Sequence, residues 1–465
     1  MEQEYKGNNK LIAGIVMGVI TFWLFAQTML NIGPAVQQDL GISAGVLNIS
    51  VSLTALFSGM FMVGAGSLAD RIGRVKMTNI GMVLSIIGSL LIVTAQGALM
   101  LILGRIIQGL SAAAIMPSTM ALMKVYFDGK ERQRALSYWS IGSWGGSGLT
   151  SLFAGMVAST LGWRAIFILS IVITVIGMWL LKGTPESKVE SISSQKFDFS
   201  GLMAFVVMML SFNLYITNGS ALGWTSLAGI GLIAVFLIST LIFVKLETIN
   251  DNSLIDFSLF KNKAYAGATL SNFLLNAAAG TLIVVNTYAQ SGRGFTSFQT
   301  GLLTIGYLIF VLIAIRMGEK FLQKYGARTP MLASAVITAA GIALMSLTFL
   351  PNSIYIIFII VGYALFGFGL GIYATPSTDT AVSNAPAEKV AVASGVYKMA
   401  SSLGGAIGVA ISASVFAAVN ADGHVHEAGS MGLLVNVLFV VIAFLGVFFT
   451  TPKDHADSVH STTAK

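Results

Sequence analysis

The chain has 465 residues, of which 55% are hydrophobic and 10% charged, and it contains no cysteine. A mean hydropathy of +0.83 excludes an ordinary soluble protein, and the absence of cysteine excludes disulfides and thiolate metal sites. The net charge is +7, yet no basic patch with interleaved aromatic residues is present, so we expect no nucleic-acid partner. Apolar runs of about 20 residues, the length that a bilayer core requires, follow one another along the chain. We therefore expect an all-α polytopic membrane protein.

Fourteen apolar runs, bounded by charged and turn residues, predict membrane-spanning helices. In chain order they lie near 11–33, 46–67, 77–96, 98–125, 135–158, 164–182, 200–218, 224–246, 264–290, 299–318, 330–350, 353–377, 390–420 and 429–450. Between the eighth and ninth, Asp251–Lys263 has apolar residues at 254, 255, 257, 259 and 260. This pattern predicts a short amphipathic helix on the cytoplasmic membrane surface.

Basic residues indicate the sidedness of the chain. Of 26 Lys and Arg residues, Arg164 and Arg293 fall in loops of one side and Arg105 lies inside a predicted helix, which leaves 23 for the other side. An excess of basic residues marks the cytoplasmic side, and an even number of helices places both termini there. His424 and His426 then lie in an outer loop; a metal-binding pair is the alternative to an exposed loop pair, and we predict no metal site.

The chain also contains an internal repeat. GRIIQG (Gly104–Gly109) and PSTM (Pro117–Met120) recur as GYALFG (Gly362–Gly367) and PSTD (Pro376–Asp379), 258 and 259 residues later. A parallel duplication of six helices with two helices between the copies accounts for fourteen, and parallel repeats are a transporter architecture with a central site. The predicted domains are a six-helix bundle at 11–182, two inserted helices at 200–246, a cytoplasmic amphipathic linker at 247–263, a second six-helix bundle at 264–450 and a cytoplasmic tail at 451–465.

The stretch GSLADRIGRVK (Gly66–Lys76) concentrates charge between two apolar runs. Gly73 permits a tight turn after the helix, and Gly66 permits close contact between helices. Asp70, at a cytoplasmic helix end, can accept hydrogen bonds from another helix N-terminus or from an arginine and so close the inner gate. The alternative is a basic loop that only sets topology. A degraded copy in the second half, EKFLQKYGAR, has Gln323 where Asp70 stands.

Arg105 is the one arginine well inside an apolar run, roughly 10 Å from the outer end of its helix at about 1.5 Å per residue. A buried cation there is costly and must face the bundle interior, a carboxylate, carbonyl groups or water. It is either a functional residue or part of a structural polar network.

These motifs resemble those of the major facilitator superfamily. The loop signature G-x-L-x-D-R-x-G-R is matched by Gly66, Asp70, Arg71, Gly73 and Arg74, and the helix-4 motif R-x-x-Q-G is matched at Arg105. The likeness runs along essentially the whole chain, and it points to the fourteen-helix drug/proton antiporter branch, where the chain is similar to NorB/NorC-type quinolone and multidrug efflux pumps. The resemblance implies two six-helix bundles around a central site, proton-coupled drug export, and a role for Arg105 in proton movement.

Two motifs depart from that branch. The helix-5 motif G-x-x-x-G-P-x-x-G-G keeps Gly142 and Gly146, which we expect to pack against a partner helix, but a serine replaces the proline. In helix 1 the branch commonly has D-x-T-x-x-N, whereas AQTMLN keeps Thr28 and Asn31 and has Ala26 in place of the aspartate. The usual proton carrier is therefore absent, and by the predicted spans none of the 19 carboxylates lies at mid-membrane.

A proton carrier must be a titratable group in a site that opens alternately to either side. The substitutes that we predict lie at or near helix ends: Asp379, Glu319, Asp39, Arg105 within its helix, and Lys398, which can reach toward Asp379. As alternatives, Asp379 acts in gating or helix capping, and Lys398 extends its amine to the membrane interface. If no carboxylate carries protons, uniport or facilitated exchange follows.

Lipophilic, cationic or zwitterionic drugs suit an apolar and aromatic pocket with a few hydrogen-bonding groups. The candidate substrate-binding residues are Gln27, Asn31, Asn48, Tyr138, Trp139, Asn272, Asn276, Tyr307 and Tyr363. Asn272 and Asn276, four residues apart, share one helix face. Each candidate is as compatible with helix packing as with ligand contact.

The leading hypothesis is a monomeric secondary active exporter in a bacterial cytoplasmic membrane. It would exchange quinolone-like drugs and dyes for protons across the lipid bilayer, with the proton gradient and no cofactor as its energy source. An exporter of an endogenous metabolite, lipid or siderophore, and a facilitator without proton coupling, are the alternatives. An ATP-driven pump is unsupported because no G-x-x-x-x-G-K-[ST] occurs, and an enzyme is disfavoured because all four histidines lie in a loop or the tail.

Overall fold

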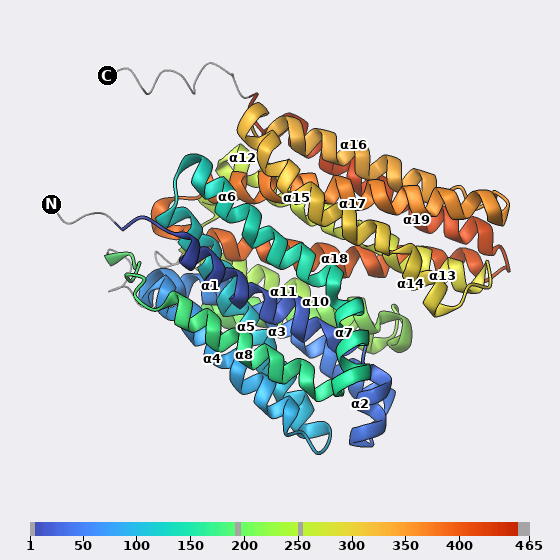
Figure 1. Cartoon of the computed structure of the whole chain (residues 1–465), viewed down its shortest axis with the longest axis horizontal. Helices are drawn as coiled ribbons and strands as arrows, with labels where there is room; N and C mark the ends of the chain where they lie inside the picture. Colours follow the sequence, from blue (N-terminus) through green and yellow to red (C-terminus); the bar gives the residue numbers. More distant parts are fainter. Residues whose placement is uncertain (1–4, 191–196, 250–253, 454–465) are drawn as a thin grey trace. The chain divides into compact units, whose positions relative to one another are not determined.

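The computed structural model describes residues 5–190, 197–249 and 254–453, and within these ranges the chain is helical and contains no β-strand (Figure 1). Contacts divide the chain into two compact units. Unit 1 comprises Met1–Asp128, Gly146–Leu259 and Ala385–Met399, and unit 2 comprises Gly129–Gly145, Phe260–Asn384 and Ala400–Lys465. The predicted boundaries of the repeat remain a prediction, because these units group residues by contact.

The helices of unit 1 are α1 (Asn9–Ile20), η1 (Thr21–Phe25), η2 (Ala26–Leu30), α2 (Gly33–Leu40), α3 (Ala44–Ile72), α4 (Arg74–Val93), α5 (Ala98–Tyr126), α7 (Gly146–Leu161), α8 (Trp163–Leu181), α10 (Phe199–Leu222), α11 (Leu227–Ile249) and η5 (Ala387–Lys389). Those of unit 2 are α6 (Gly129–Ser140), η3 (Ile141–Gly145), α12 (Lys263–Ala277), α13 (Gly280–Ser291), α14 (Ser297–Leu303), α15 (Ile305–Tyr325), α16 (Arg328–Met345), α17 (Asn352–Ser383) and α19 (Val425–Thr450). Two elements belong to both units: η4 (Phe257–Lys261) and α18 (Val390–Asn420).

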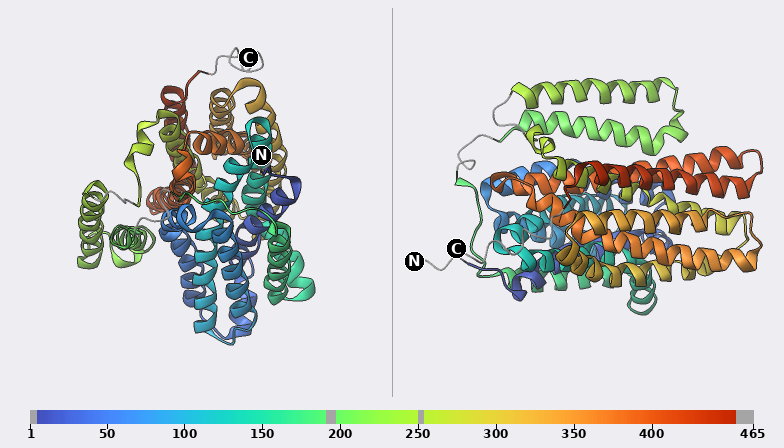
Figure 2. Two further views of the ribbon diagram at one scale, coloured as in Figure 1. Left: turned by 90° about the vertical axis from the view of Figure 1, so that its left-hand side faces the viewer. Right: turned by 90° about the horizontal axis from the view of Figure 1, so that it is seen from above.

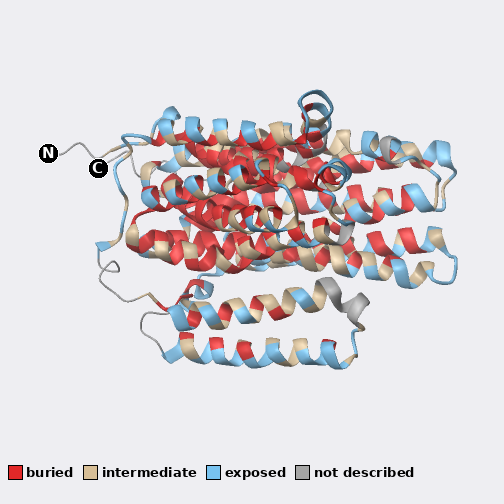
Figure 3. Cartoon of the chain, turned by 90° about the horizontal axis from the view of Figure 1, so that it is seen from below, coloured by how far each residue is buried: buried red, intermediate tan, exposed pale blue. Residues whose placement is uncertain are grey.

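Thirteen helices of the described chain are long and apolar enough to cross a membrane. One predicted span, 135–158, the fifth in chain order, is not among these thirteen. It is observed as α6, η3 and α7, which follow one another without a break. Large apolar side chains are exposed on the helices, among them Leu227, Leu241 and Phe449 at 90%, 72% and 75%. Figure 3 shows that exposed positions occur along the length of the helices. Exposure of this kind suits hydrocarbon and not water, so the prediction of an all-α polytopic membrane protein is confirmed.

Two predicted helix ends were wrong for the same physical reason. The span 46–67 continues as α3 to Ile72, and the span 353–377 continues as α17 to Ser383, so Asp70 and Asp379 both lie within helices. Charged residues suggested the end of each run, yet each carboxylate is buried against an arginine. Because the charge has its partner within the chain, the helix continues past it.

Two further spans are not single α-helices. In 11–33, α1 passes into the π-helical η1 and the 3₁₀-helical η2, and α2 then begins at Gly33 and Pro34, since the first turn is where a helix accommodates proline. In 264–290, α12 and α13 are separated at Ala278 and Ala279.

The connection between α11 and α12 also differs from the prediction. Residues 251–253 of the expected amphipathic helix lie outside the described residues, and 254–263 contains only the five-residue 3₁₀ helix η4. Leu259 is buried while Phe257 and Phe260 are exposed. In a segment this short, the single 3₁₀ helix η4 buries Leu259 and leaves Phe257 and Phe260 exposed.

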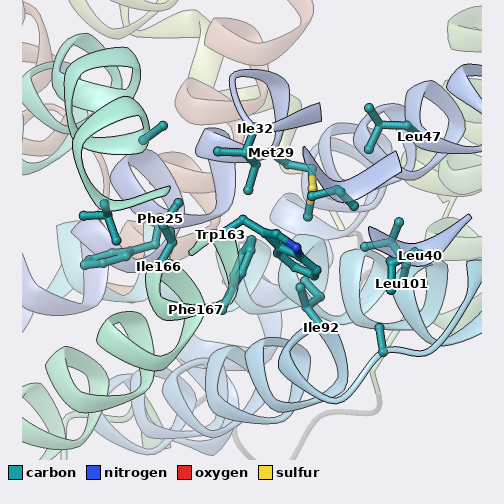
Figure 4. Close-up of a cluster of buried hydrophobic side chains, with 14 residues drawn as sticks. Phe25, Met29, Ile32, Leu40, Leu47, Ile92, Leu101, Trp163, Ile166 and Phe167 are labelled. Atoms are coloured by element: carbon teal, nitrogen blue, oxygen red, sulfur yellow. The ribbon is translucent and has the colours of Figure 1, made fainter. Parts of the chain in front are cut away.

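A buried apolar cluster holds the end of the first helical stretch in unit 1 (Figure 4). Trp163 and Phe167 of α8 pack edge to face, with ring centroids 6.2 Å apart. The other labelled members are Phe25, Met29, Ile32, Leu40, Leu47, Ile92, Leu101 and Ile166. These residues come from η1, η2, α2, α3, α4, α5 and α8, so one cluster holds seven elements together.

Glycines let two pairs of helices approach to backbone contact. A Cβ atom at Gly88 of α4 would lie 2.9 Å from the carbonyl oxygen of Gly104 in α5, and one at Gly104 would lie 2.9 Å from that of Gly88. In unit 2 the same arrangement recurs, with Gly341 of α16 and Gly362 of α17 at 2.6 and 2.8 Å. Small residues at such crossings are the usual means of close packing in membranes.

Replacing Gly104 by Leu should therefore destabilise unit 1. The added side chain has no space between α4 and α5, and overpacking of this kind costs about 1–3 kcal/mol. We expect a clearly lower melting temperature for the detergent-purified protein. Gly155→Leu on α7 is the matched control, because a Cβ atom there meets nothing within 4 Å; equal losses in both variants would contradict the packing argument.

Candidate functional site

The carboxylate of Asp70 binds the first turn of α18. Its Oδ2 accepts hydrogen bonds from the backbone N–H groups of Ala391 and Val392, at 3.1 Å each. These N–H groups belong to the first turn, where a helix has no partners of its own, so Asp70 caps α18 as an N-cap side chain would. The side chain is only 1% exposed, and a buried charge held in this way favours this one arrangement of α3 and α18.

Two glycines bring α3 and α18 close enough for this contact. A Cβ atom at Gly66 would collide with the carbonyl group of Ala391, and one at Gly395 would lie 2.8 Å from the carbonyl oxygen of Met62. Gly66 belongs to the predicted motif, whereas Gly395 was not singled out by the sequence. The one sequence feature that could have identified Gly395 is its position in the first turns of a helix that begins with small residues.

Arg74 connects Asp70 to two other segments. Its Nε donates to Asp70 Oδ1 at 2.8 Å, while its Nη1 and Nη2 donate to Ser187 Oγ and to the carbonyl oxygen of Ala387, both at 3.0 Å. Lys124 also donates to the carbonyl of Ala385. The residues just before α18 are thus bound by two cations of unit 1.

Gly73 and Arg71 occupy the turn between α3 and α4. Gly73 has a φ of +118°, a backbone conformation that favours glycine. After it, the backbone N–H groups of Val75 and Lys76 donate to the carboxylate of Glu186, at 2.9 Å each. Arg71 is buried, with its guanidinium 5.8 Å from the centre of the Phe197 ring. Sequence reasoning missed Glu186, because nothing in its local pattern indicates a helix N-terminus about 110 residues away.

Arg105 is fully enclosed in unit 1 and is 1% exposed. Its Nη1 donates to the carbonyl oxygen of Ala26 and to Gln108 Oε1, at 2.7 Å each, and its own carbonyl accepts from Thr54 Oγ1 at 2.9 Å. Within the described chain it forms no ion pair with a carboxylate. Ala26 stands where the family pattern has an aspartate, and it contributes a backbone carbonyl instead of a carboxylate. It lies where the first helix changes from π to 3₁₀ geometry.

The remaining predicted proton-linked residues have separate partners. In unit 2, Asp379 Oδ1 accepts from Arg132 Nε at 2.9 Å, and Glu319 pairs with Arg316. In unit 1 the ammonium of Lys398 lies 5.4 Å from the centre of the Trp23 ring. The predicted approach of Lys398 to Asp379 remains a prediction, since the two residues belong to different units.

Asp39 differs from these because it is exposed. It pairs with Arg164 at the surface, with side-chain exposures of 44% and 35%, and it accepts a hydrogen bond from Trp163 Nε1 at 3.2 Å. It therefore ties α2 to the start of α8.

The candidate substrate-binding residues are distributed over both units. Asn272 Nδ2 donates to Ser401 Oγ at 2.6 Å, and Asn276 Nδ2 donates to Asn272 Oδ1 at 2.9 Å, as expected for two residues on one face. Tyr138 lies between two guanidinium groups, 4.6 Å from Arg316 and 5.8 Å from Arg134.

The other candidates show varied exposure. Trp139 and Tyr363 are buried, Gln27 and Tyr307 are half-buried, and Asn31 is exposed, while the side chain of Asn48 lies outside the described residues. The Tyr307 ring lies 5.6 Å from that of Phe366.

The two glycines of the antiporter motif fall at the junction of η3 and α7. Gly142 is buried in the π-helical η3, and a Cβ atom at Gly146 would lie 3.1 Å from Trp23 Cβ. Gly146 thus permits α7 to pack closely on η1 within unit 1.

These features define a class of protein: a polytopic helical membrane protein with repeated glycine-packed helix pairs and buried, internally satisfied charges. A sequence model of the Major Facilitator Superfamily matches residues 12–409 and 268–463. The chain belongs to that superfamily, which is a family of transporters.

Relatives and solved structures agree with this assignment. Two relatives from Staphylococcus aureus strains MRSA252 and COL, each named "Quinolone resistance protein NorB", are 56% identical over 453 residues, 97% of this chain and 98% of each relative. The human organic anion transporter MFSD10 (TETRAN) has a similar structure, with a TM-score of 0.65 at 12% identity, covering 94% of this chain and 98% of that one. A bacterial homologue of the iron transporter ferroportin in an outward-facing state gives 0.66 at 11% identity, with coverage of 94% and 98%. These two structures support the fold alone.

Replacing Asp70 by Asn should cost far more stability than replacing Asp39 by Asn. Removing one partner of a buried ion pair costs about 3–5 kcal/mol, and Arg74 would keep its charge without the carboxylate that it binds. The exposed Asp39–Arg164 pair is worth about 0–1 kcal/mol, so Asp39→Asn is the matched control. Thermal unfolding of both purified variants measures the difference; equal melting temperatures would mean that Asp70 is not bound as described.

Proposed function

We propose that this chain is a secondary active exporter of lipophilic, cationic or zwitterionic drugs, including quinolone-like compounds and dyes, and that it exchanges them for protons. The observation that carries this proposal is the 56% identity over 97% of the chain to a protein named for quinolone resistance. Because this identity extends over nearly the whole of both chains, we expect the two proteins to share a class of substrate. The site lies in the bacterial cytoplasmic membrane, with both termini in the cytoplasm, as the distribution of basic residues predicts.

The Asp70 contact is the gate in this proposal. Alternating access requires a contact that is made when one entrance is closed and broken when it opens. Asp70 forms several charge-assisted hydrogen bonds to α18 and Arg74, and such bonds are strong only while water is excluded. Opening would expose the carboxylate and the helix N-terminus to water, which solvates both, so the contact is reversible.

Arg105 is the proton-linked cation in this proposal. Arg105 is buried and bonds to the Ala26 carbonyl, and no carboxylate of the described chain pairs with it. A negative charge that moves next to Arg105 would therefore stabilise this site. The cation attracts the carboxylate of a zwitterionic drug, or a carboxylate of the chain that moves next to it, and in doing so it opposes protonation of that carboxylate. This opposition is what exchange of a drug for a proton requires.

Ala26 supports one alternative, a facilitator without proton coupling. Where the family pattern has a carboxylate, this chain has none, and transport without a titrating group would follow a drug gradient alone. Export of an endogenous metabolite, lipid or siderophore would use the same machinery with another substrate.

Reconstitution separates these functions. With the purified chain in liposomes and an imposed pH gradient, we expect a fluorescent organic cation or a quinolone to move against the proton flow, with a simultaneous change in lumenal pH. Liposomes without protein and liposomes with the gradient collapsed by an ionophore are the controls. Drug movement that is indifferent to the gradient would establish the facilitator, and no movement of any drug would favour an endogenous substrate.

Arg105→Met should reduce that transport about tenfold or more, because hydrogen bonds to a charged group contribute about 1.5–3 kcal/mol and each 1.4 kcal/mol is about a factor of ten. Methionine has a similar length, but it leaves the Ala26 carbonyl and Gln108 Oε1 without this donor, so we also expect a lower melting temperature, and transport is compared per amount of folded protein. Arg164→Met, at an exposed ion pair, is the control and should transport normally. Wild-type transport by Arg105→Met would remove Arg105 from the mechanism.

A further inference from the structure

Two buried carboxylates meet at one end of the inserted helices α10 and α11. Asp198 caps α10, and Glu247 lies in the last turn of α11; they are 5% and 6% exposed. Figure 2 shows these two helices side by side, and they pack on each other within unit 1. The family signature uses neither residue, so their burial requires another explanation.

Each carboxylate has one satisfied oxygen. Asp198 Oδ1 accepts from the Gly201 N–H at 2.9 Å and from Ser200 Oγ at 2.7 Å, and Glu247 Oε2 accepts from the Ile255 N–H at 2.7 Å. The second oxygens, Asp198 Oδ2 and Glu247 Oε1, are buried and have no hydrogen-bond partner in the described chain. An ionised oxygen left in this state is costly.

The two unpartnered oxygens face the same point. A Cβ atom placed on Gly201 would collide with Asp198 Oδ2 and would lie 2.6 Å from Glu247 Oε1. Glycine at this position therefore leaves a hollow into which both oxygens project. Any side chain there would separate the two carboxylates.

Among the described residues, the surroundings supply less positive charge than two ionised carboxylates need. From α3, Arg71 interacts electrostatically with Asp198 and also with Asp70, so its one charge is shared. On α11 the nearest cation in sequence, Lys245, is exposed. In the following segment Asp256 is bound by Lys389, at 2.9 Å. Two like charges confined to one buried site do not both ionise.

We propose that Asp198 and Glu247 bind one proton between them, as a hydrogen bond from a carboxyl group to a carboxylate across the hollow above Gly201. The proton comes from water and returns to it, and no other reactant is needed. A metal ion fits less well, because a hard cation such as Ca²⁺ takes about six to eight oxygen ligands and only two oxygens are unpartnered here. No group of three or more metal-binding side chains occurs among the described residues.

This proton makes the attachment of the inserted helices responsive to pH. With the proton bound, the pair carries one negative charge, which Arg71 balances. When the proton leaves, two negative charges face each other in a buried site, the ends of α10 and α11 separate, and Arg71 is drawn from Asp70 toward the pair. This proposal does not depend on drug export. It depends only on the carboxyl groups of Asp198 and Glu247.

Infrared spectroscopy of the purified full-length protein tests the proton directly. We expect the band of a protonated carboxyl group that persists at neutral pH, shifts in heavy water, and disappears as the pH rises. Asp198→Asn and Glu247→Gln should each remove this band, and Asp256→Asn, a nearby carboxylate held by Lys389, should leave it intact. A band that survives in both variants, or no such band in the wild type, would overturn the proposal.

Thermal unfolding gives a second measurement on the same proteins. Loss of the proton leaves two negative charges facing each other in a buried site, so we expect the melting temperature of the wild type to fall as the pH rises. Glu247→Gln mimics the protonated state, since its amide can donate to Asp198, and its melting temperature should lose this dependence on pH and exceed that of the wild type in alkaline buffer. If added Na⁺, K⁺ or Ca²⁺ restores the alkaline stability of the wild type, the site binds a cation and the proposal is wrong.

Discussion

Hydrocarbon offers no hydrogen bonds, so a polar group inside this chain has to find its partner within the chain. Two buried charges illustrate how that is achieved. Asp70 uses N–H groups at the start of α18, and Arg105 uses the carbonyl of Ala26, where the first helix changes its winding. In both cases the partner is a backbone group at a place where a helix begins or changes its winding. The first-turn N–H groups of α18 have no partners within their own helix, so they are available to Asp70.

The two copies of the repeat share their packing more than their chemistry. Gly88–Gly104 and Gly341–Gly362 make equivalent backbone contacts, because a close helix crossing tolerates only small residues. The residue after each second glycine differs, being Arg105 in one copy and Tyr363 in the other. Duplication thus preserved the scaffold, while the charged groups diverged and left the first copy with both the Asp70 contact and the buried arginine.

Much of the fold could be predicted from the sequence, since apolar runs of membrane length specify helices almost independently of their neighbours. The errors arose where tertiary contacts decide. Asp70 and Asp379 suggested helix ends, but each carboxylate pairs with an arginine, and the helices continue past them. The π and 3₁₀ turns of the first helix leave no local pattern. Of the candidate site, the motif residues around Asp70 could be identified, whereas Glu186 could not, because its partners are about 110 residues distant.

The buried carboxylates of the described chain differ in the charge that surrounds them. Asp70, Glu319 and Asp379 are each bound by an arginine, so each of these negative charges has a positive partner within the chain. Asp198 and Glu247 are the opposite case, because together they hold more negative charge than the cation near them balances. A proton that enters an ion pair loses a favourable interaction, whereas a proton that enters this pair removes a repulsion. Because the helix 1 position of Ala26 offers no carboxylate, the proton-binding site that we propose lies on the inserted helices and not on helix 1.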